Sequence, residues 1–204
     1  MKSRGSVAII GGSMAGLFAA ISLRSLNFDV NIFERSAGDL TNGGAGIATH
    51  SELYNALETA GVELRAEMGI QSIGRIMFDN EGKIMHRVAM KQIMTSWGLI
   101  YRFLRKQIPK ENYHSEHCLQ NLSFSGKSVT AVFTNGDDVT TDWLIGADGA
   151  RSQVRRIVAP TITPIYAGYL GWRGLIDENL IPKEVVDQLS LQMAFGMAPG
   201  GHWL

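Results

Sequence analysis

The sequence predicts a protein of the α/β class, in which a doubly wound domain built on a parallel sheet is joined to part of an antiparallel-sheet domain. Three observations predict this class. The N-terminus is typical of a strand, a glycine turn, a helix and a second strand; a later apolar strand runs into a polar turn near residue 146; and runs typical of antiparallel hairpins lie between them. The 204 residues, 45% of them hydrophobic and 19% charged, are enough to bury a full core.

The N-terminal elements form a continuous nucleotide-binding pattern. Val7–Ile10 is an all-apolar run, as expected for a parallel strand buried on both faces. A turn from Gly11 to Gly16 opens a helix that stops near Asn27, and the next strand ends at Glu34, 18 residues beyond Gly16. In a dinucleotide site the glycines permit a tight turn, the helix N-terminus faces a pyrophosphate, and an acid at this spacing accepts ribose hydroxyls. The pattern therefore predicts a dinucleotide site.

Three side chains bear on which dinucleotide this site would bind. Ser13 stands where the G-x-G-x-x-G pattern has its second glycine, but a small residue keeps its backbone N–H for an anion. The carboxylate of Glu34 would repel a 2′-phosphate, which favours NAD or FAD over NADP. Arg35 leaves three roles open, since it could meet a 2′-phosphate, cover an adenine or lie in solvent.

Composition excludes several other classes. Nineteen Lys and Arg balance nineteen Asp and Glu without a basic stripe, so we expect no nucleic-acid partner. Cys118 is the only cysteine, which excludes an intrachain disulfide and fits a cytoplasmic location, and the five histidines show no metal-ligand spacing. The apolar N-terminal run is interrupted by Gly11 and Gly12, so we expect neither a signal peptide nor stable membrane insertion.

The middle of the chain predicts a loop, two helices and several strands. The glycine-rich loop Ala37–Ala48 would let backbone approach a flat ligand at Gly43, Gly44 and Gly46, or it is a mobile surface loop. Ser51 is expected to cap a helix that runs to Ala60, and Ser96 another that runs to about Gln107 before Pro109. The predicted strands are a hairpin of Ile73–Phe78 and Lys83–Val88, and a meander of His114–Phe124, Ser128–Phe133 and Val139–Ile145.

The meander runs into a second motif, residues 146–155, which reads G-A-D-G-x-x-S-x-V-R. Together with the N-terminal turn and acid, this motif resembles the signature of the class A FAD monooxygenases, the single-component flavin aromatic hydroxylases. Further segments resemble the 2,6-dihydroxypyridine 3-monooxygenase group within that family. They are Gly46-Ile47 before Glu52-Leu53, Gly61-Val62-Glu63, Ser96-Trp97 with Tyr101, Tyr113-His114 with Cys118-Leu119, and Tyr166-Ala167-Gly168-Tyr169 with Trp172-Arg173-Gly174. The resemblance covers essentially the whole chain.

The resemblance implies FAD as the cofactor and NADH or NADPH as the electron donor. It implies a pyrophosphate on the glycine turn, a ribose on Glu34 with Arg35 alongside, and flavin near Gly46 and Ile47. It also implies adenine near Leu119, and pyrophosphate and ribityl chain near Asp148 and Gly149. The alternative is an Asp148-Gly149 turn with Ser152 capping the next helix. Many members carry an arginine where this chain has Trp97. The implied cofactor-binding residues are Gly11, Gly12, Ser13, Met14, Ala15, Gly16, Glu34, Arg35, Gly46, Ile47, Leu119, Asp148 and Gly149.

The resemblance also implies the domain plan and the activity. A Rossmann-like FAD-binding domain is expected over 1–72 and 96–160, and part of an antiparallel-sheet substrate-binding domain over 73–95 and 161–204, with strands from Tyr166 onward. The family's later Gly-Asp motif has no counterpart, so the chain resembles an N-terminal portion. The leading hypothesis is an FAD-dependent monooxygenase that hydroxylates a small electron-rich aromatic or heteroaromatic ring, and that is inactive alone if it is truncated. The sequence assigns no residue a catalytic role and predicts no metal. It leaves a homodimer open. The alternatives are a vestigial, non-catalytic FAD- or nucleotide-binding protein and an NAD-linked dehydrogenase.

Overall fold

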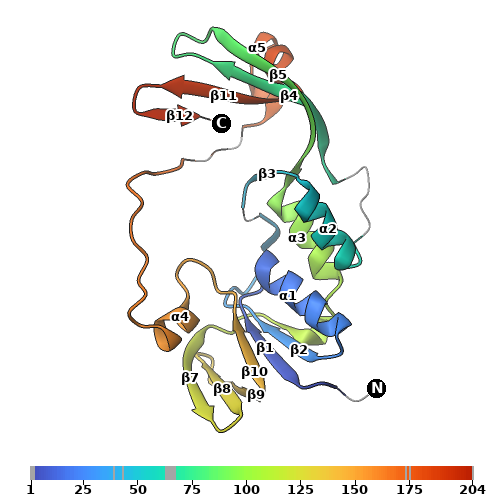
Figure 1. Ribbon diagram of the computed structural model, residues 1–204, viewed down its shortest axis with the longest axis vertical. Helices are drawn as coiled ribbons and strands as arrows, with labels where there is room; N and C mark the ends of the chain where they lie inside the picture. Colours follow the sequence, from blue (N-terminus) through green and yellow to red (C-terminus); the bar gives the residue numbers. More distant parts are fainter. Residues whose placement is uncertain are drawn as a thin grey trace. The chain divides into compact units, whose positions relative to one another are not determined.

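The computed structural model describes residues 3–38, 40–42, 44–62, 68–172, 174 and 176–203. It forms two compact units, one of Met1–Gly44, Asn55–Leu64 and Trp97–Tyr169, the other of Ala45–Tyr54, Arg65–Ser96 and Leu170–Leu204. The expectations for Gly43, Glu63 and Arg173 lie outside the described residues. Mixed parallel and antiparallel sheets with helices confirm the predicted α/β class (Figure 1).

The first unit is built on a four-stranded parallel sheet with the order β10-β1-β2-β6. Its strands are β1 (Ser6–Ile10), β2 (Asp29–Phe33), β6 (Tyr113–His114) and β10 (Trp143–Gly146). The central strands are almost wholly buried, as expected when both faces of a parallel sheet are covered. The helices and short 3₁₀ turns that lie wholly within this unit are α1 (Met14–Ser25), α3 (Trp97–Lys106), α4 (Gln153–Val158), η1 (Leu40–Asn42) and η3 (Lys110–Asn112).

The two faces of the parallel sheet are covered differently (Figure 1). Side chains alternate along a strand, so Ala8 and Ile10 point to one face, where they pack with Phe33 against a three-stranded antiparallel sheet. That sheet consists of β7 (Leu119–Ser125), β8 (Ser128–Phe133) and β9 (Asp138–Thr141). On the other face α1 contacts β1 and β2, and α3 contacts α1.

Helix α1 ends for a reason that the sequence carries. Asn27 adopts a left-handed backbone with φ 72°, which asparagine tolerates better than most residues. The N–H of Asn27 then donates to the carbonyl of Arg24, and the N–H of Phe28 donates to that of Leu23. These two bonds satisfy carbonyls that the helix end leaves free and turn the chain directly into β2.

Two of the predicted meander strands are wrong, because each is divided between two sheets. Glu116 has φ 60°, which breaks the run 114–124; the residues before it form β6 beside β2, and β7 begins only at Leu119. The run 139–145 is broken at Asp142, whose carboxylate accepts from the N–H and hydroxyl of Ser6 at 2.7 and 2.8 Å. These bonds attach the chain to the start of β1, so the following residues join the parallel sheet as β10.

The second unit contains a five-stranded sheet with the order β12-β11-β4-β5-β3. Its strands are β3 (Gly46–Ala48), β4 (Ile70–Phe78), β5 (Ile84–Ser96), β11 (Gln192–Ala198) and β12 (Gly201–Trp203). Neighbours are antiparallel except β11 and β4, which run parallel. The predicted hairpin is confirmed, with longer strands, and its turn is closed by the Asp79 carboxylate, which accepts from the N–H groups of Glu81 and Lys83.

Several expectations near this sheet need correction. The expected loop at 37–48 includes the strand β3, which pairs with β5. Helix α2 (Ser51–Thr59) starts at Ser51, and the residue before it, His50, accepts from the Leu53 N–H through both its carbonyl and its ring Nδ1. β11 and β12 confirm the expectation of strands after Tyr166, but they begin only at Gln192. The described residues between 166 and 191 hold only the 3₁₀ turn η4 (Glu178–Leu180) and α5 (Lys183–Leu189). No helix among the described residues has the length and apolar character to traverse a bilayer.

Candidate functional site

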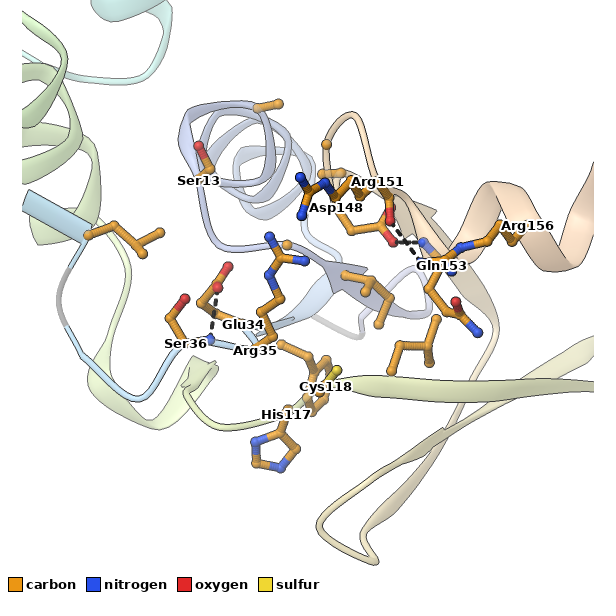
Figure 2. Close-up of a pocket in the computed structure, with 18 of the residues that line it drawn as sticks. Ser13, Glu34, Arg35, Ser36, His117, Cys118, Asp148, Arg151, Gln153 and Arg156 are labelled. Carbon is orange, nitrogen blue, oxygen red and sulfur yellow. Dashed lines mark hydrogen bonds between the residues drawn. The ribbon is translucent and has the colours of Figure 1, made fainter. Parts of the chain in front are cut away.

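The first unit has a cavity of about 570 Å³ at the carboxyl ends of its parallel strands (Figure 2). The sheet order puts β2 on one side of β1 and β10 on the other. In an open α/β sheet, the chain connections diverge at such a switch point and leave a crevice that binds ligands. The lining is Ile10, Gly11, Ser13, Ala15, Phe33, Glu34, Arg35, Ser36, Leu40, Gly44, Trp97, His117, Cys118, Leu119, Ala147, Asp148, Gly149, Arg151, Gln153 and Arg156.

Glycines shape the turn between β1 and α1. Gly11 has φ 109°, which other residues rarely adopt, and a Cβ there would collide with the carbonyl oxygen of Ala147. A Cβ at Gly16 would collide with the carbonyl oxygen of Gly11. Gly12 is restricted as well, because a Cβ would overlap the hydroxyl of Tyr113. At Gly11 the backbone of the turn borders the cavity without a side chain in between, as expected for an anion-binding turn.

The N-terminus of α1 faces this cavity with its amide groups free. Ser13 occupies the N-cap position in an extended conformation and its hydroxyl makes no capping bond. Within the described residues, the N–H groups of Ser13, Met14 and Ala15 have no acceptor, and the first turn of α1 contains no acidic residue. Unpaired amides and the helix dipole make this end electropositive.

Glu34 is the acid directly after β2, and its carboxylate accepts two hydrogen bonds from backbone N–H groups. Its Oε2 accepts from the Gly12 N–H at 2.8 Å and its Oε1 accepts from the Ser36 N–H at 2.9 Å. The residue is only 6% exposed, although it lines the cavity. A carboxylate has about four acceptor positions, so about two remain for hydroxyl groups of a ligand.

The cationic side chains of the cavity have few partners. The guanidinium groups of Arg35 and Arg151 form no hydrogen bond or ion pair with any residue that the structure describes, and both line the cavity. Figure 2 shows Arg35 extending into the space below the glycine turn. Arg156 is less available, since it donates to the carbonyls of Ser152 and Arg151. Two unpaired positive charges beside a helix N-terminus suit an anionic ligand.

Asp148 lines the same cavity, but its carboxylate is largely committed to the fold. Its Oδ1 accepts from the Ser152 hydroxyl at 2.5 Å, and its Oδ2 accepts from the N–H groups of Gln153 and Val154 at 2.6 and 3.1 Å. Ser152 is the N-cap of α4 and accepts from the Arg155 N–H. Asp148 therefore caps α4, as the turn-and-cap alternative expects, and it retains about one acceptor position at the cavity wall.

An aromatic wall supports the other side of the cavity. Phe33 stacks on His114 at 4.8 Å and on Phe133 at 4.9 Å, and His117 packs edge-on against Phe133. His117 also pairs with Asp137 at 3.1 Å. Burial and the neighbouring His117 lower the pKa of His114 below its ordinary value, while Asp137 opposes that shift.

Eight of the thirteen expected cofactor-binding residues line the cavity: Gly11, Ser13, Ala15, Glu34, Arg35, Leu119, Asp148 and Gly149. Gly12, Met14 and Gly16 belong to the turn and the start of α1 without lining the cavity. Gly46 and Ile47 lie on β3 in the second unit, opposite Ser96 and Thr95 of β5.

Sequence reasoning missed Arg151, Arg156, His117 and Tyr113 as parts of this site. Arg151 was detectable, since it lies inside the second motif. Arg156 directly follows that motif, whereas His117 and Tyr113 reach the site through contacts between segments far apart in the chain. Trp97, noted as the replacement of an arginine, lines the cavity and stacks on Tyr101 with ring centroids 5.1 Å apart.

The residues of this cavity fit a dinucleotide. A pyrophosphate would fit the glycine turn, where a Cβ would take up the space. It would also match the N-terminal amides of α1 and the two arginines, which have no acceptor among the described residues. Glu34 retains acceptors for a ribose, and its negative charge disfavours a 2′-phosphate. Among the described residues no cluster of His, Cys, Asp or Glu could hold a metal ion.

Comparisons with known proteins agree with this geometry. A family described as "FAD binding domain" matches residues 4–193. The 2,6-dihydroxypyridine 3-monooxygenase of Paenarthrobacter nicotinovorans is 34% identical over 96% of this chain and 49% of its own length. The aurachin C monooxygenase/isomerase of Stigmatella aurantiaca is 28% identical over 99% of this chain and 56% of its own length. The chain thus spans about half the length of the curated relatives it matches.

A solved structure shows the same fold. The structure of 2,6-dihydroxypyridine-3-hydroxylase from Arthrobacter nicotinovorans matches with a TM-score of 0.90 and 33% sequence identity. The match covers 99% of this chain and 51% of that chain.

Proposed function

We propose, from the premise that this chain belongs to the FAD binding domain family, that it forms the cofactor-binding part of a flavin monooxygenase. The reaction would hydroxylate a small electron-rich aromatic or heteroaromatic ring, with NADH or NADPH as reductant and O2 as the oxygen source. The second unit would supply part of the substrate-binding domain. We place the protein in the cytoplasm, with a homodimer as its proposed assembly.

One observation carries the proposal: four complementary features meet in one cavity. The glycine turn and the N-terminus of α1 supply amides, Arg35 and Arg151 supply positive charge, and Glu34 supplies acceptors. A dinucleotide presents a pyrophosphate and ribose hydroxyls, which need these groups. FAD is favoured over NAD by the family and by the second motif with the β7–β9 sheet, which have no place in a simple NAD-linked dehydrogenase.

FAD, when bound, supplies the redox chemistry with O2 that protein side chains lack. The residues of this chain then bind, orient and shield. The turn and the two arginines neutralise the pyrophosphate, Glu34 fixes a ribose, and Asp148 holds α4 and its loop at the wall of the cavity. The aromatic wall of Phe33 and His117 limits access of water to the adenosine end.

The proposal is tested first by cofactor retention. The purified chain is mixed with FAD and passed through gel filtration, and visible flavin absorption that co-elutes with protein at about one flavin per chain supports it. A matched pair of variants gives the control. In Gly16→Ala the new Cβ meets the carbonyl oxygen of Gly11, whereas at Gly38 a Cβ meets nothing within 4 Å. We expect Gly16→Ala to lose FAD and Gly38→Ala to retain it.

Activity is a separate measurement. Oxidation of NADH or NADPH that small hydroxylated aromatic rings stimulate, with formation of a hydroxylated product, supports the monooxygenase. Retention of FAD without such activity would fit both a truncated monooxygenase and the non-catalytic flavin-binding alternative. A colourless chain that instead binds NAD would favour the dehydrogenase.

A further inference from the structure

The peptide groups of Gly12 are held by two side chains. Its N–H donates to Glu34 Oε2 at 2.8 Å, and its carbonyl accepts from the hydroxyl of Tyr113 at 3.2 Å. Tyr113 lies at the start of β6, 101 residues further along the chain. Gly12 is the residue directly before Ser13, where the free amides of the α1 N-terminus begin. The orientation of Gly12 therefore sets the direction of these amides.

Tyr113 is itself held in place. The guanidinium of Arg105 lies 4.1 Å above the ring centroid of Tyr113 and donates to the carbonyl of Ile108. The hydroxyl of Tyr101 lies 3.3 Å from that of Tyr113, and Tyr101 is only 2% exposed. Such contacts on the ring and on its hydroxyl leave Tyr113 little rotational freedom.

The surroundings of Tyr113 favour its protonated form. Burial and the bond with Tyr101 raise the pKa of Tyr113 well above its usual value, so the phenol remains a donor at neutral pH. A hydroxyl has one proton. Since Tyr113 donates that proton to Gly12, Tyr101 donates to Tyr113, and the two tyrosines form a directed chain that ends on the glycine turn.

The contact also accounts for a glycine that the dinucleotide fingerprint does not require. A Cβ at Gly12 would overlap the hydroxyl of Tyr113 and approach its Cζ and Cε2 to 2.6 and 2.8 Å. Ser13 stands at the fingerprint's second glycine position. In this chain, glycine at residue 12 and tyrosine at residue 113 thus form one structural unit.

We propose that Tyr113 is a positioning residue that locks the glycine turn in the conformation that binds a pyrophosphate. It acts through Gly12 and touches no ligand. The proposal rests on the proposed cofactor site, because the turn that it positions is the one assigned there to a pyrophosphate.

The first test needs no cofactor. Tyr113→Phe removes the hydroxyl but keeps the ring under Arg105, so the fold is retained. Amide hydrogen exchange is measured on the FAD-free chain for the segment from Ile10 to Leu17. We expect exchange there to accelerate about five- to tenfold, as for the loss of one buried hydrogen bond. The control Tyr54→Phe removes a hydroxyl that bonds Thr49 at 2.5 Å in the second unit, and should leave this segment unchanged.

The second test separates positioning from general stability. ADP contains a pyrophosphate, whereas adenosine has none. Tyr113→Phe should weaken FAD and ADP by the same factor, about five- to tenfold, and leave the adenosine affinity unchanged. Tyr101→Phe removes only the donor to Tyr113, so it should show the same pattern with a smaller factor.

The outcomes decide separate claims. Unchanged exchange at the turn in Tyr113→Phe overturns the proposal whether or not FAD binds. Faster exchange together with equal losses of affinity for ADP and adenosine also overturns the proposal, because a general loosening of the fold would weaken both ligands equally. If the wild-type chain binds neither FAD nor ADP, the proposed function fails. Faster exchange at the turn in Tyr113→Phe would then show that Tyr113 only stabilises the fold of the turn, which overturns its assignment to a pyrophosphate site.

Discussion

Glu34→Gln is the substitution whose effect the structure specifies most sharply. It keeps the size of the side chain but replaces two acceptor oxygens by one oxygen and one NH2 group. In the folded chain the two oxygens serve different amides, those of Gly12 and Ser36, at 2.8 and 2.9 Å. A glutamine can accept from only one of them, and its NH2 group then faces the other N–H, donor against donor.

The magnitude follows from burial and charge. Glu34 is 6% exposed, so water does not readily replace the lost acceptor. A buried donor left without a partner costs about 1–3 kcal/mol, and a hydrogen bond to a charged group contributes about 1.5–3 kcal/mol. We expect the free energy of unfolding to fall by about 2 kcal/mol, and the Kd for FAD to rise at least about tenfold because a ribose acceptor is lost too.

The assay is urea unfolding of the FAD-free chain followed by circular dichroism, and then FAD titration of the same preparations. Glu81→Gln is the control, because Glu81 is an exposed turn residue whose side chain makes no hydrogen bond or ion pair within the described residues. A free energy of unfolding for Glu34→Gln within about 0.5 kcal/mol of the wild-type value is what a neutral surface substitution gives. That result would mean that the carboxylate does not satisfy both amides, and it would refute the reasoning.

Three other predictions use the same measurements. Asp148→Asn should lower the free energy of unfolding by about 1 kcal/mol, since α4 loses a charged cap; an unchanged urea midpoint would contradict this. Arg35→Gln with Arg151→Gln should weaken FAD binding and flatten its salt dependence, and an unaltered salt slope would exclude both guanidiniums from the pyrophosphate. Because the pKa of His114 is lowered in the folded chain, the unfolded chain binds more protons and stability should fall as pH drops below about 6.5. His114→Gln should lessen that fall, and an identical pH profile would count against it.

The N-terminal half of the candidate site could be predicted because its information is local. β1, the turn, α1 and β2 follow one another, and the glycines, the apolar runs and the acid keep a fixed spacing. The structure matches these predicted elements to within two residues at each end. Even the end of α1, two residues before Asn27, follows from the tolerance of asparagine for a left-handed backbone.

The remainder depends on contacts between distant segments. Nothing in the run 139–145 shows that Asp142 will bond Ser6, 136 residues away in the sequence, and so divide one predicted strand between two sheets. The role of Tyr113 likewise depends on Gly12, and alternation of apolar residues carries no such information. Pattern reasoning finds that a strand exists but does not identify its neighbours.

The hydrogen bonds of the two acids in the cavity support the proposal of an anionic ligand. Glu34 and Asp148 both line the cavity. Glu34 accepts from two backbone N–H groups, and Asp148 accepts from two more and from the Ser152 hydroxyl. The two carboxylates therefore stabilise the fold. The guanidinium groups of Arg35 and Arg151 and the N-terminal amides of α1, in contrast, have no acceptor among the described residues. A neutral ligand would leave these donors unsatisfied, and a cation would be repelled. The pyrophosphate that we propose would satisfy them, and the remaining acceptor positions of Glu34 would take the hydroxyls that flank it.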